Sequence, residues 1–72
     1  MSDYHINVFY SDEDKGWIAD IPDLPHCSAF GSTAEEAVRE VTLAKTAWLE
    51  SARNSGTPIP KPAYRPANYH SP

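Results

Sequence analysis

The hydrophobic period of the sequence changes at Ser32, and this change constrains the fold more than any other feature. Before it, apolar residues alternate with polar ones, as in strands; after it, they recur every three or four residues, as in a helix. The segment "TAEE" is a capping box, in which the Thr33 side chain accepts a hydrogen bond from the backbone of Glu36 and the Glu36 side chain reaches back to the cap. We predict a helix from Thr33 to Asn54 that stops at Gly56 in the left-handed conformation.

One stripe of this helix is apolar and rich in alanine. Its members are Ala34, Ala37, Val38, Val41, Ala44, Trp48 and Ala52. Because four of them are alanines, we expect the helix to lie close to a sheet, with Trp48 filling space at its far end. Lys45 falls near the middle of the stripe, and we favour a stem that lies on apolar surface and an ammonium group in water over a functional buried lysine. Leu43 and Ala47 lie on the opposite face, either as isolated exposed residues or as part of a contact with a second chain.

Three segments before the helix have the composition of strands. They are residues 4–10, 17–21 and 26–30. The first has one apolar face made of Tyr4, Ile6, Val8 and Tyr10. The polar segment 11–16 has the composition of a hairpin loop, Pro22 ends the second strand because proline has no N–H for the ladder, and Gly31 ends the third. The sequence therefore predicts an α+β fold that opens with a β-hairpin.

Residues 57–72 contain five of the seven prolines of the chain and cannot form a helix or a central strand. We predict an extended, proline-rich C-terminal arm there and a folded domain over residues 1–56. Ile59, Tyr64 and Tyr69 give the arm three apolar anchors, enough to pack along this chain or along a neighbour, with disorder as the alternative.

The acidic residues are concentrated in the first part of the chain. All ten precede residue 51, where only Lys15, Arg39 and Lys45 oppose them, so this part carries a net charge near −7 while the arm is slightly basic. An acidic body repels a phosphate backbone and attracts a basic partner, which argues against direct nucleic-acid binding by this chain. Ordinary solubilising charge explains the same pattern equally well.

Length and cysteine content limit how this chain gains stability. A domain of 72 residues has a thin core, and Cys27 is the only cysteine, so no disulfide can form within one chain. We therefore expect a homo-oligomer. The lone thiol, the lack of a signal peptide and the lack of an apolar run of about 20 residues predict a cytoplasmic protein with no membrane role.

The special residues crowded between Asp20 and Val38 fit a structural corner better than a catalytic or metal site. His26 and Cys27 are adjacent, and neighbours on a strand point to opposite faces, so they cannot easily grip one ion or act as a base and nucleophile. In the acidic loop, Gly16 comes one place earlier than the glycine of a calcium loop, and no bidentate glutamate closes the loop. We predict no catalytic residue, no metal site, no cofactor and no enzymatic activity, and we expect a buried thiol.

The ordered combination of these pieces resembles the HicB-like antitoxin domain family. The segments "DEDKGWIADIPDLPHCSAFGSTAEEAV" and "WLESARNSGTPIPKP" carry the resemblance. They contain an acidic loop, a strand ending in Ile-Pro-Asp-Leu, a short strand, Gly-x-Thr, a helix opening with Glu-Glu-Ala, and a Gly-x-x-Ile-Pro-x-Pro stop. Residues 4–62, about four fifths of the chain, match the family in order and spacing.

The resemblance implies a three-stranded antiparallel sheet with one long helix packed across it, in the order β-β-β-α. This is often described as a partial ribonuclease H-like fold, and it lacks the nuclease carboxylates. The resemblance also implies a partner, HicA, a small basic RNA-cleaving toxin that such proteins bind and block. His26 departs from the family, which usually has glycine before the cysteine. The chain ends at Pro72 without a DNA-binding segment, so we expect no repression of its own operon by this chain.

These features lead to three functional hypotheses. The first is an antitoxin-type protein-binding module that neutralises a HicA-like toxin through exposed acids of the hairpin and helix, namely Asp12, Asp14, Asp23 and Glu40. The second is a stand-alone oligomer that acts as a scaffold or binds a small ligand, with no toxin partner. The third, a metal-dependent nuclease, rests on fold analogy alone. We expect Trp17 and Phe30 to pack in the core, with a subunit interface as the alternative.

Overall fold

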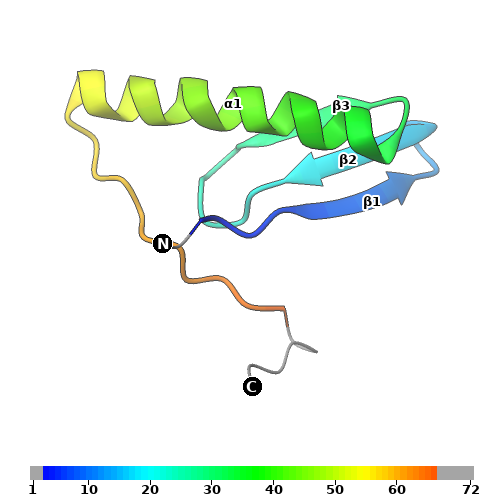
Figure 1. The fold of residues 1–72 in the computed structure, drawn as a ribbon, viewed down its shortest axis with the longest axis horizontal. Coiled ribbons are helices and arrows are strands. Elements are labelled where there is room, and N and C mark those ends of the chain that lie inside the picture. The colour runs from blue at the N-terminus through cyan, green and yellow to red at the C-terminus, as the bar shows by residue number, and fades with distance from the viewer. Residues whose placement is uncertain (1–2, 67–72) are drawn as a thin grey trace.

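A computed structural model describes residues 3–66 of the chain. Three strands form one antiparallel sheet in the order β1-β2-β3, and one helix packs across it (Figure 1). The elements are β1 (Asn7–Ser11), β2 (Gly16–Asp20), β3 (Ser28–Gly31) and α1 (Ala34–Ser55). The α+β fold and the β-β-β-α order are therefore confirmed.

The register of the strands divides the side chains between two faces of the sheet. On the face that packs against α1, one row across the strands consists of Val8, Ala19 and Ala29. On the opposite face, the next row consists of Phe9, Ile18 and Phe30. We call this second face, with its row of three hydrophobic residues, the open face.

The core is small and lies between the sheet and α1. Its buried members are Ala19, Ile21, Leu24, Cys27, Ala37 and Val41. The helix lies mainly over β3 and β2, so the helix-facing side of β1 is partly uncovered, and Val8 and Tyr10 are 37% and 51% exposed. The predicted apolar face of the first strand is therefore only half buried. Gly31, by contrast, lies directly under the first turn of α1, where a Cβ atom would be 2.3 Å from the backbone nitrogen of Ala37. The expected close approach of helix and sheet is confirmed there.

The first strand begins later than predicted, at Asn7 instead of residue 4. Asn7 pairs with Asp20, the last residue of β2. Beyond it, Ile21 donates its backbone N–H away from β1, to the carbonyl of Cys27 at 3.0 Å, and Pro22 has no N–H to donate to a neighbouring strand. The chain before Asn7 consequently has no strand to pair with. Two residues of that segment still pack against the core from outside the ladder, namely Tyr4 and Ile6.

Two consecutive β-turns connect β2 to β3. Leu24 donates its N–H to the carbonyl of Ile21, Cys27 donates to the carbonyl of Leu24, both at 3.1 Å, and each turn has proline at its second position. His26 occupies the third position of the second turn with φ of 61°, the left-handed conformation that a type II turn requires and that glycine adopts most readily. The third strand therefore begins at Ser28, and the prediction that it starts at His26 is wrong, while the predicted corner is confirmed.

The predicted capping box closes the start of α1. Thr33 is the N-cap, and its hydroxyl oxygen accepts the backbone N–H of Glu36 at 3.1 Å. The Glu36 carboxylate reaches one residue further back than predicted and accepts the N–H of Ser32. At the other end, Gly56 has φ of 74° and donates its N–H to carbonyls of the last turn. Both predicted helix ends are thus confirmed to within one residue.

Two side chains of the helix stripe, Lys45 and Trp48, form polar contacts with other segments of the chain. The Nζ of Lys45 lies 3.1 Å from a carboxylate oxygen of Asp3, so the ammonium group reaches the surface as expected. The pKa of Asp3 lies below its ordinary value because its carboxylate accepts the backbone N–H of Tyr4 and also pairs with Lys45. The indole N–H of Trp48 donates to the carbonyl of Pro25 at 3.0 Å, which holds the second turn of the corner against the helix.

The described part of the arm, residues 57–66, is extended and returns toward the N-terminal segment (Figure 1). The hydroxyl of Tyr4 donates to the carbonyl of Pro60. One carboxylate oxygen of Asp23 accepts the backbone N–H groups of Ala63 and Tyr64, at 3.2 and 3.1 Å. The arm therefore packs along its own chain, through backbone contacts as much as through side chains.

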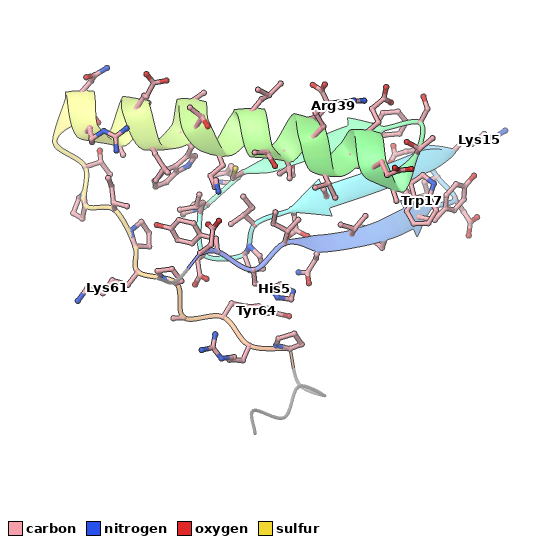
Figure 2. The ribbon with its side chains drawn as sticks, viewed as in Figure 1. His5, Lys15, Trp17, Arg39, Lys61 and Tyr64 are labelled. Carbon is pink, nitrogen blue, oxygen red and sulfur yellow. The ribbon has the colours of Figure 1, made fainter. Side chains whose placement is uncertain are left out.

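The three predicted anchors of the arm differ from one another. The ring of Tyr64 contacts the ring of His5, with centroids 4.9 Å apart (Figure 2). Ile59 is exposed, so the prediction that it anchors the arm is wrong. Tyr69 lies outside the described residues.

Candidate partner-binding surface

The loop between β1 and β2 and the start of α1 lie at the same end of the molecule (Figure 1). This loop and the first two turns of the helix hold six acidic residues, which are Asp12, Glu13, Asp14, Glu35, Glu36 and Glu40. Lys15 and Arg39 are the basic residues of the same region (Figure 2). We call this region the acidic end. Six acids against two bases give it a net charge of −4, which equals the formal charge of the whole chain, so the other charges cancel.

The hairpin tip presents Asp12 and Asp14 on an ordered turn. The hydroxyl of Ser11 donates to the Asp14 carboxylate at 2.9 Å and accepts the backbone N–H of Asp14 at 3.3 Å. Lys15 has φ of 53°, a left-handed conformation that returns the chain to β2. Asp12 is exposed beside this turn. The tip therefore holds the Asp14 carboxylate in a defined position at the surface, beside the exposed Asp12.

The four predicted contact residues do not form one cluster. Glu40 is exposed on the second turn of α1, within the acidic end. Asp23 lies in the corner between β2 and β3, at the opposite end of the sheet from the hairpin tip, and its carboxylate holds the arm. The structure thus groups Asp12, Asp14 and Glu40 and separates Asp23 from them. Their contact with a partner stays a prediction.

The open face is a second exposed surface, and sequence reasoning missed it. Phe9 and Phe30 are 49% and 48% exposed, so the expectation that Phe30 packs in the core is wrong, whereas Trp17 does pack against the core. The Phe30 ring covers Gly16, where a Cβ atom would lie 2.3 Å from it. In the sequence, the one sign of this surface is Phe9, which stands on the otherwise polar face of the first strand. The alignment of Phe9 with Phe30 depends on the strand register, which the sequence does not reveal.

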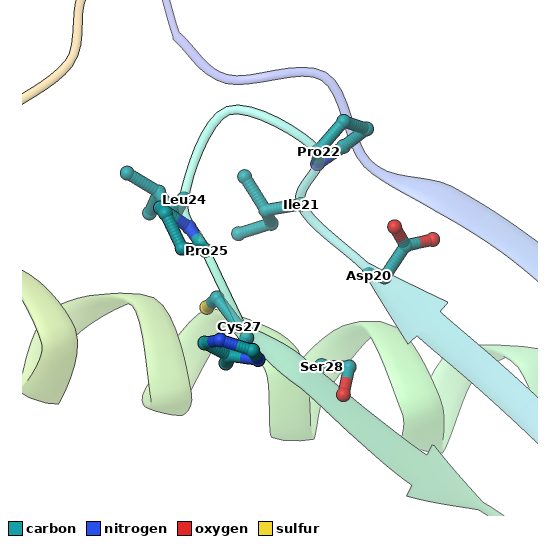
Figure 3. Close-up of a pocket in the computed structure, with 8 residues that line it drawn as sticks. Asp20, Ile21, Pro22, Leu24, Pro25, Cys27 and Ser28 are labelled. Carbon is teal, nitrogen blue, oxygen red and sulfur yellow. The ribbon is translucent and has the colours of Figure 1, made fainter.

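The corner between β2 and β3 contains a hollow of about 310 Å³ (Figure 3). Ile21, Leu24 and Cys27, which line it, also belong to the core, and His26 is another lining residue. Burial raises the pKa of the Cys27 thiol, and the nearby charge of Lys45 opposes this with a smaller effect. The buried thiol predicted from the sequence is confirmed. A protonated, buried thiol is a poor nucleophile.

The remaining chemistry of the described chain is sparse. Over residues 3–66, no three histidine, cysteine, aspartate or glutamate side chains gather in a way that could hold a metal ion. Within that same range, no helix has the length and apolar character needed to cross a membrane. The fold and its surfaces define a small α+β domain with an acidic end and an exposed hydrophobic row, features suited to contact with other macromolecules.

Comparison with known proteins identifies the family. The family described as HicB-like antitoxin of bacterial toxin-antitoxin systems matches residues 4–70. A UPF0150 protein of Synechocystis sp. is 38% identical over 53 residues, which cover 74% of this chain and 73% of that protein. No solved structure matches significantly. The chain belongs to the HicB-like antitoxin family, as the resemblance implied.

Proposed function

We propose that this chain is an antitoxin-type protein-binding module that neutralises a small, basic, RNA-cleaving toxin of the HicA type. Family membership suggests the toxin–antitoxin role. The observation that carries the proposed mode of binding is the acidic end, which holds a charge of −4 while the rest of the chain is neutral. Such an arrangement orients a basic partner toward one end, speeds association and makes it sensitive to salt.

The acidic end also supports a physical mode of inhibition. A toxin that cleaves RNA has to bind phosphates with basic side chains. The carboxylates of Asp12, Asp14 and Glu40 compete for those side chains and cover the surface that RNA needs. This requires no chemistry by the antitoxin, so we propose no enzymatic activity, no cofactor and no direct nucleic-acid binding for the chain. The proposed site of action is the cytoplasm, where such a toxin meets RNA.

Asp23 has a different part in this proposal. Its carboxylate accepts two backbone N–H groups of the arm, so it stabilises the arm beside the N-terminal segment. We propose that it acts on partner binding through the position of the arm. In this proposal, the direct contacts with the toxin are made by the acidic end.

The test measures RNA cleavage by a HicA-family toxin encoded in the same genome, with increasing amounts of the purified chain. We expect stoichiometric inhibition by the wild type. We expect Glu40→Lys alone to slow association, and the double variant Asp12→Lys and Glu40→Lys to slow it about ten-fold at low salt, with smaller differences at high salt. Glu50→Lys is the matched control for Glu40→Lys, because both glutamates are exposed on α1 and only Glu40 belongs to the acidic end.

Two results would count against the proposal in different ways. Full toxin activity in the presence of excess wild-type chain rules out the antitoxin function. Equal slowing by Glu40→Lys and Glu50→Lys rules out the acidic end as the contact surface but leaves the function standing.

A stand-alone oligomer without a toxin partner is the second candidate function. The exposed hydrophobic row of the open face and the uncovered side of β1 favour it. Self-association of the purified chain without any inhibition of the toxin would select this candidate.

A further inference from the structure

Strand β1 is an edge strand of the sheet. Within residues 3–66, its ladder joins β2 and no other backbone hydrogen bond reaches it. Its sequence, NVFYS, contains no charge and no proline, and its pairing with β2 is continuous, without a bulge. Edge strands of soluble proteins usually carry charged residues, prolines or bulges, because these features prevent pairing with another chain. β1 therefore has the properties of a strand that receives a partner.

The side chains of β1 are exposed and apolar on both faces of the sheet. Val8 and Tyr10 lie on the helix-facing side, Phe9 lies on the open face, and each is more than a third exposed. The other edge, β3, differs because it has four residues and lies beneath the helix. A chain that added to β1 would cover apolar surface on both faces at once.

We propose that the strand added to β1 is β1 of a second copy of this chain, paired antiparallel about a two-fold axis at Phe9. The two three-stranded sheets then form one continuous sheet. In this register Phe9 lies opposite the partner's Phe9, and Val8 lies opposite the partner's Tyr10. A two-fold axis makes the contact self-complementary, so it closes after two copies.

The distribution of charge favours this antiparallel arrangement. The strand itself is uncharged, so no like charges meet across the new ladder. A parallel arrangement would place the two acidic hairpin tips, residues 12–15, side by side. The antiparallel arrangement places them at opposite ends of the dimer, where residues 12–15 lie opposite residues 3–6 of the other copy. The single acid of that segment, the partner's Asp3, then falls opposite Lys15.

The exposed area sets the strength of this contact. Half-exposed Phe9 and Tyr10 rings each leave about 100 Å² available for burial. The aromatic area buried per copy is thus about 200 Å², well below the 800 Å² or so per partner of a standard stable interface. The dimer is therefore reversible, and its population depends on concentration. This inference does not depend on the toxin partner.

Sedimentation of the full chain from about 10 µM to about 1 mM tests the proposal. We expect the wild type to shift from monomer to dimer over this range. Phe9→Lys places two like charges at the two-fold axis and keeps the chain monomeric throughout. Phe30→Lys is the matched control, because Phe30 is equally exposed on the same face but lies on β3, and it should dimerise like the wild type. Circular dichroism of each variant checks that it is folded.

A second measurement needs no substitution. In a mixture of isotope-labelled and unlabelled wild type, filtered nuclear Overhauser spectra should show contacts between Val8 of one copy and the partner's Tyr10. Wild type that stays monomeric at the highest concentration overturns the proposal. So does a dimer that Phe30→Lys abolishes and Phe9→Lys leaves intact, since that result means that two open faces pack together.

Discussion

Gly31→Ala is expected to destabilise this fold far more than the addition of one methyl group would indicate. A Cβ atom at Gly31 would lie 2.3 Å from the nitrogen of Ala37, 2.8 Å from the carbonyl carbon of Glu36 and 2.9 Å from the Cα of Ala37. All three are backbone atoms in the first turn of α1. No side chain can rotate away, so the whole helix start has to move off β3.

The size of the effect follows from this geometry. Overpacking of a protein core costs about 1 to 3 kcal/mol of folding free energy. Because the added Cβ would meet backbone atoms that cannot rotate away, we place Gly31→Ala at the upper end, about 3 kcal/mol. A domain of this length has a total stability of about 4 to 11 kcal/mol. Each kcal/mol shifts the melting temperature of such a domain by about 4 to 8 °C, so we expect a fall of about 12 to 24 °C.

Thermal and urea unfolding followed by circular dichroism measure this loss, and two other glycines serve as controls. At Gly16 the added Cβ would meet the Phe30 ring, an exposed side chain that can turn into solvent, and would lie 3.0 Å from one backbone atom, the carbonyl oxygen of Gly31, so we expect about 1 kcal/mol. At Gly56 nothing lies within 4 Å, and the left-handed φ of 74° alone costs about 1 kcal/mol. If Gly31→Ala costs no more than Gly16→Ala, the helix backbone does not rest on β3 as described.

Two further predictions concern the corner. His26→Gly should stabilise the protein by about 0.5 to 1 kcal/mol, because relief of the left-handed conformation outweighs the greater freedom of glycine in the unfolded chain; a lower urea midpoint would show that the imidazole stabilises the turn. The pKa of Cys27 is raised in the folded state. The stabilisation that the protonated Cys27 thiol contributes to the folded state is therefore complete below the unfolded thiol pKa of about 8.5. This stabilisation falls as pH rises above that value. Urea midpoints of wild type and Cys27→Ala should converge from pH 8 toward about pH 10, and parallel curves would contradict this.

The helix and the corner were predictable because their signals are local. Thr33 and Gly56 define the ends of α1 through hydrogen bonds within one turn of the helix. Pro22 and Pro25 occupy the second positions of two tight turns, which involve four residues each. Chain direction in these segments depends on neighbours in the sequence, so the sequence alone was sufficient.

The surfaces were decided by tertiary structure. Periodicity extended the first strand back to residue 4, but the strand begins at Asn7 because the loss of a ladder partner beyond Asp20 is a property of β2. Asp23 looked like a free surface acid until the arm, forty residues later, was found to donate to it. The row of Phe9 and Phe30 exists only through register.

The charge of the protein shows the same division between sequence and structure. Composition determined that the chain is acidic and that its last residues are slightly basic. Only the fold brought the hairpin tip beside the start of α1, returned the arm to the neutral remainder and placed β1 at the edge of the sheet. The physical reason is that local periodicity encodes which element a residue belongs to, whereas the sharing of a surface depends on packing between segments distant in the chain.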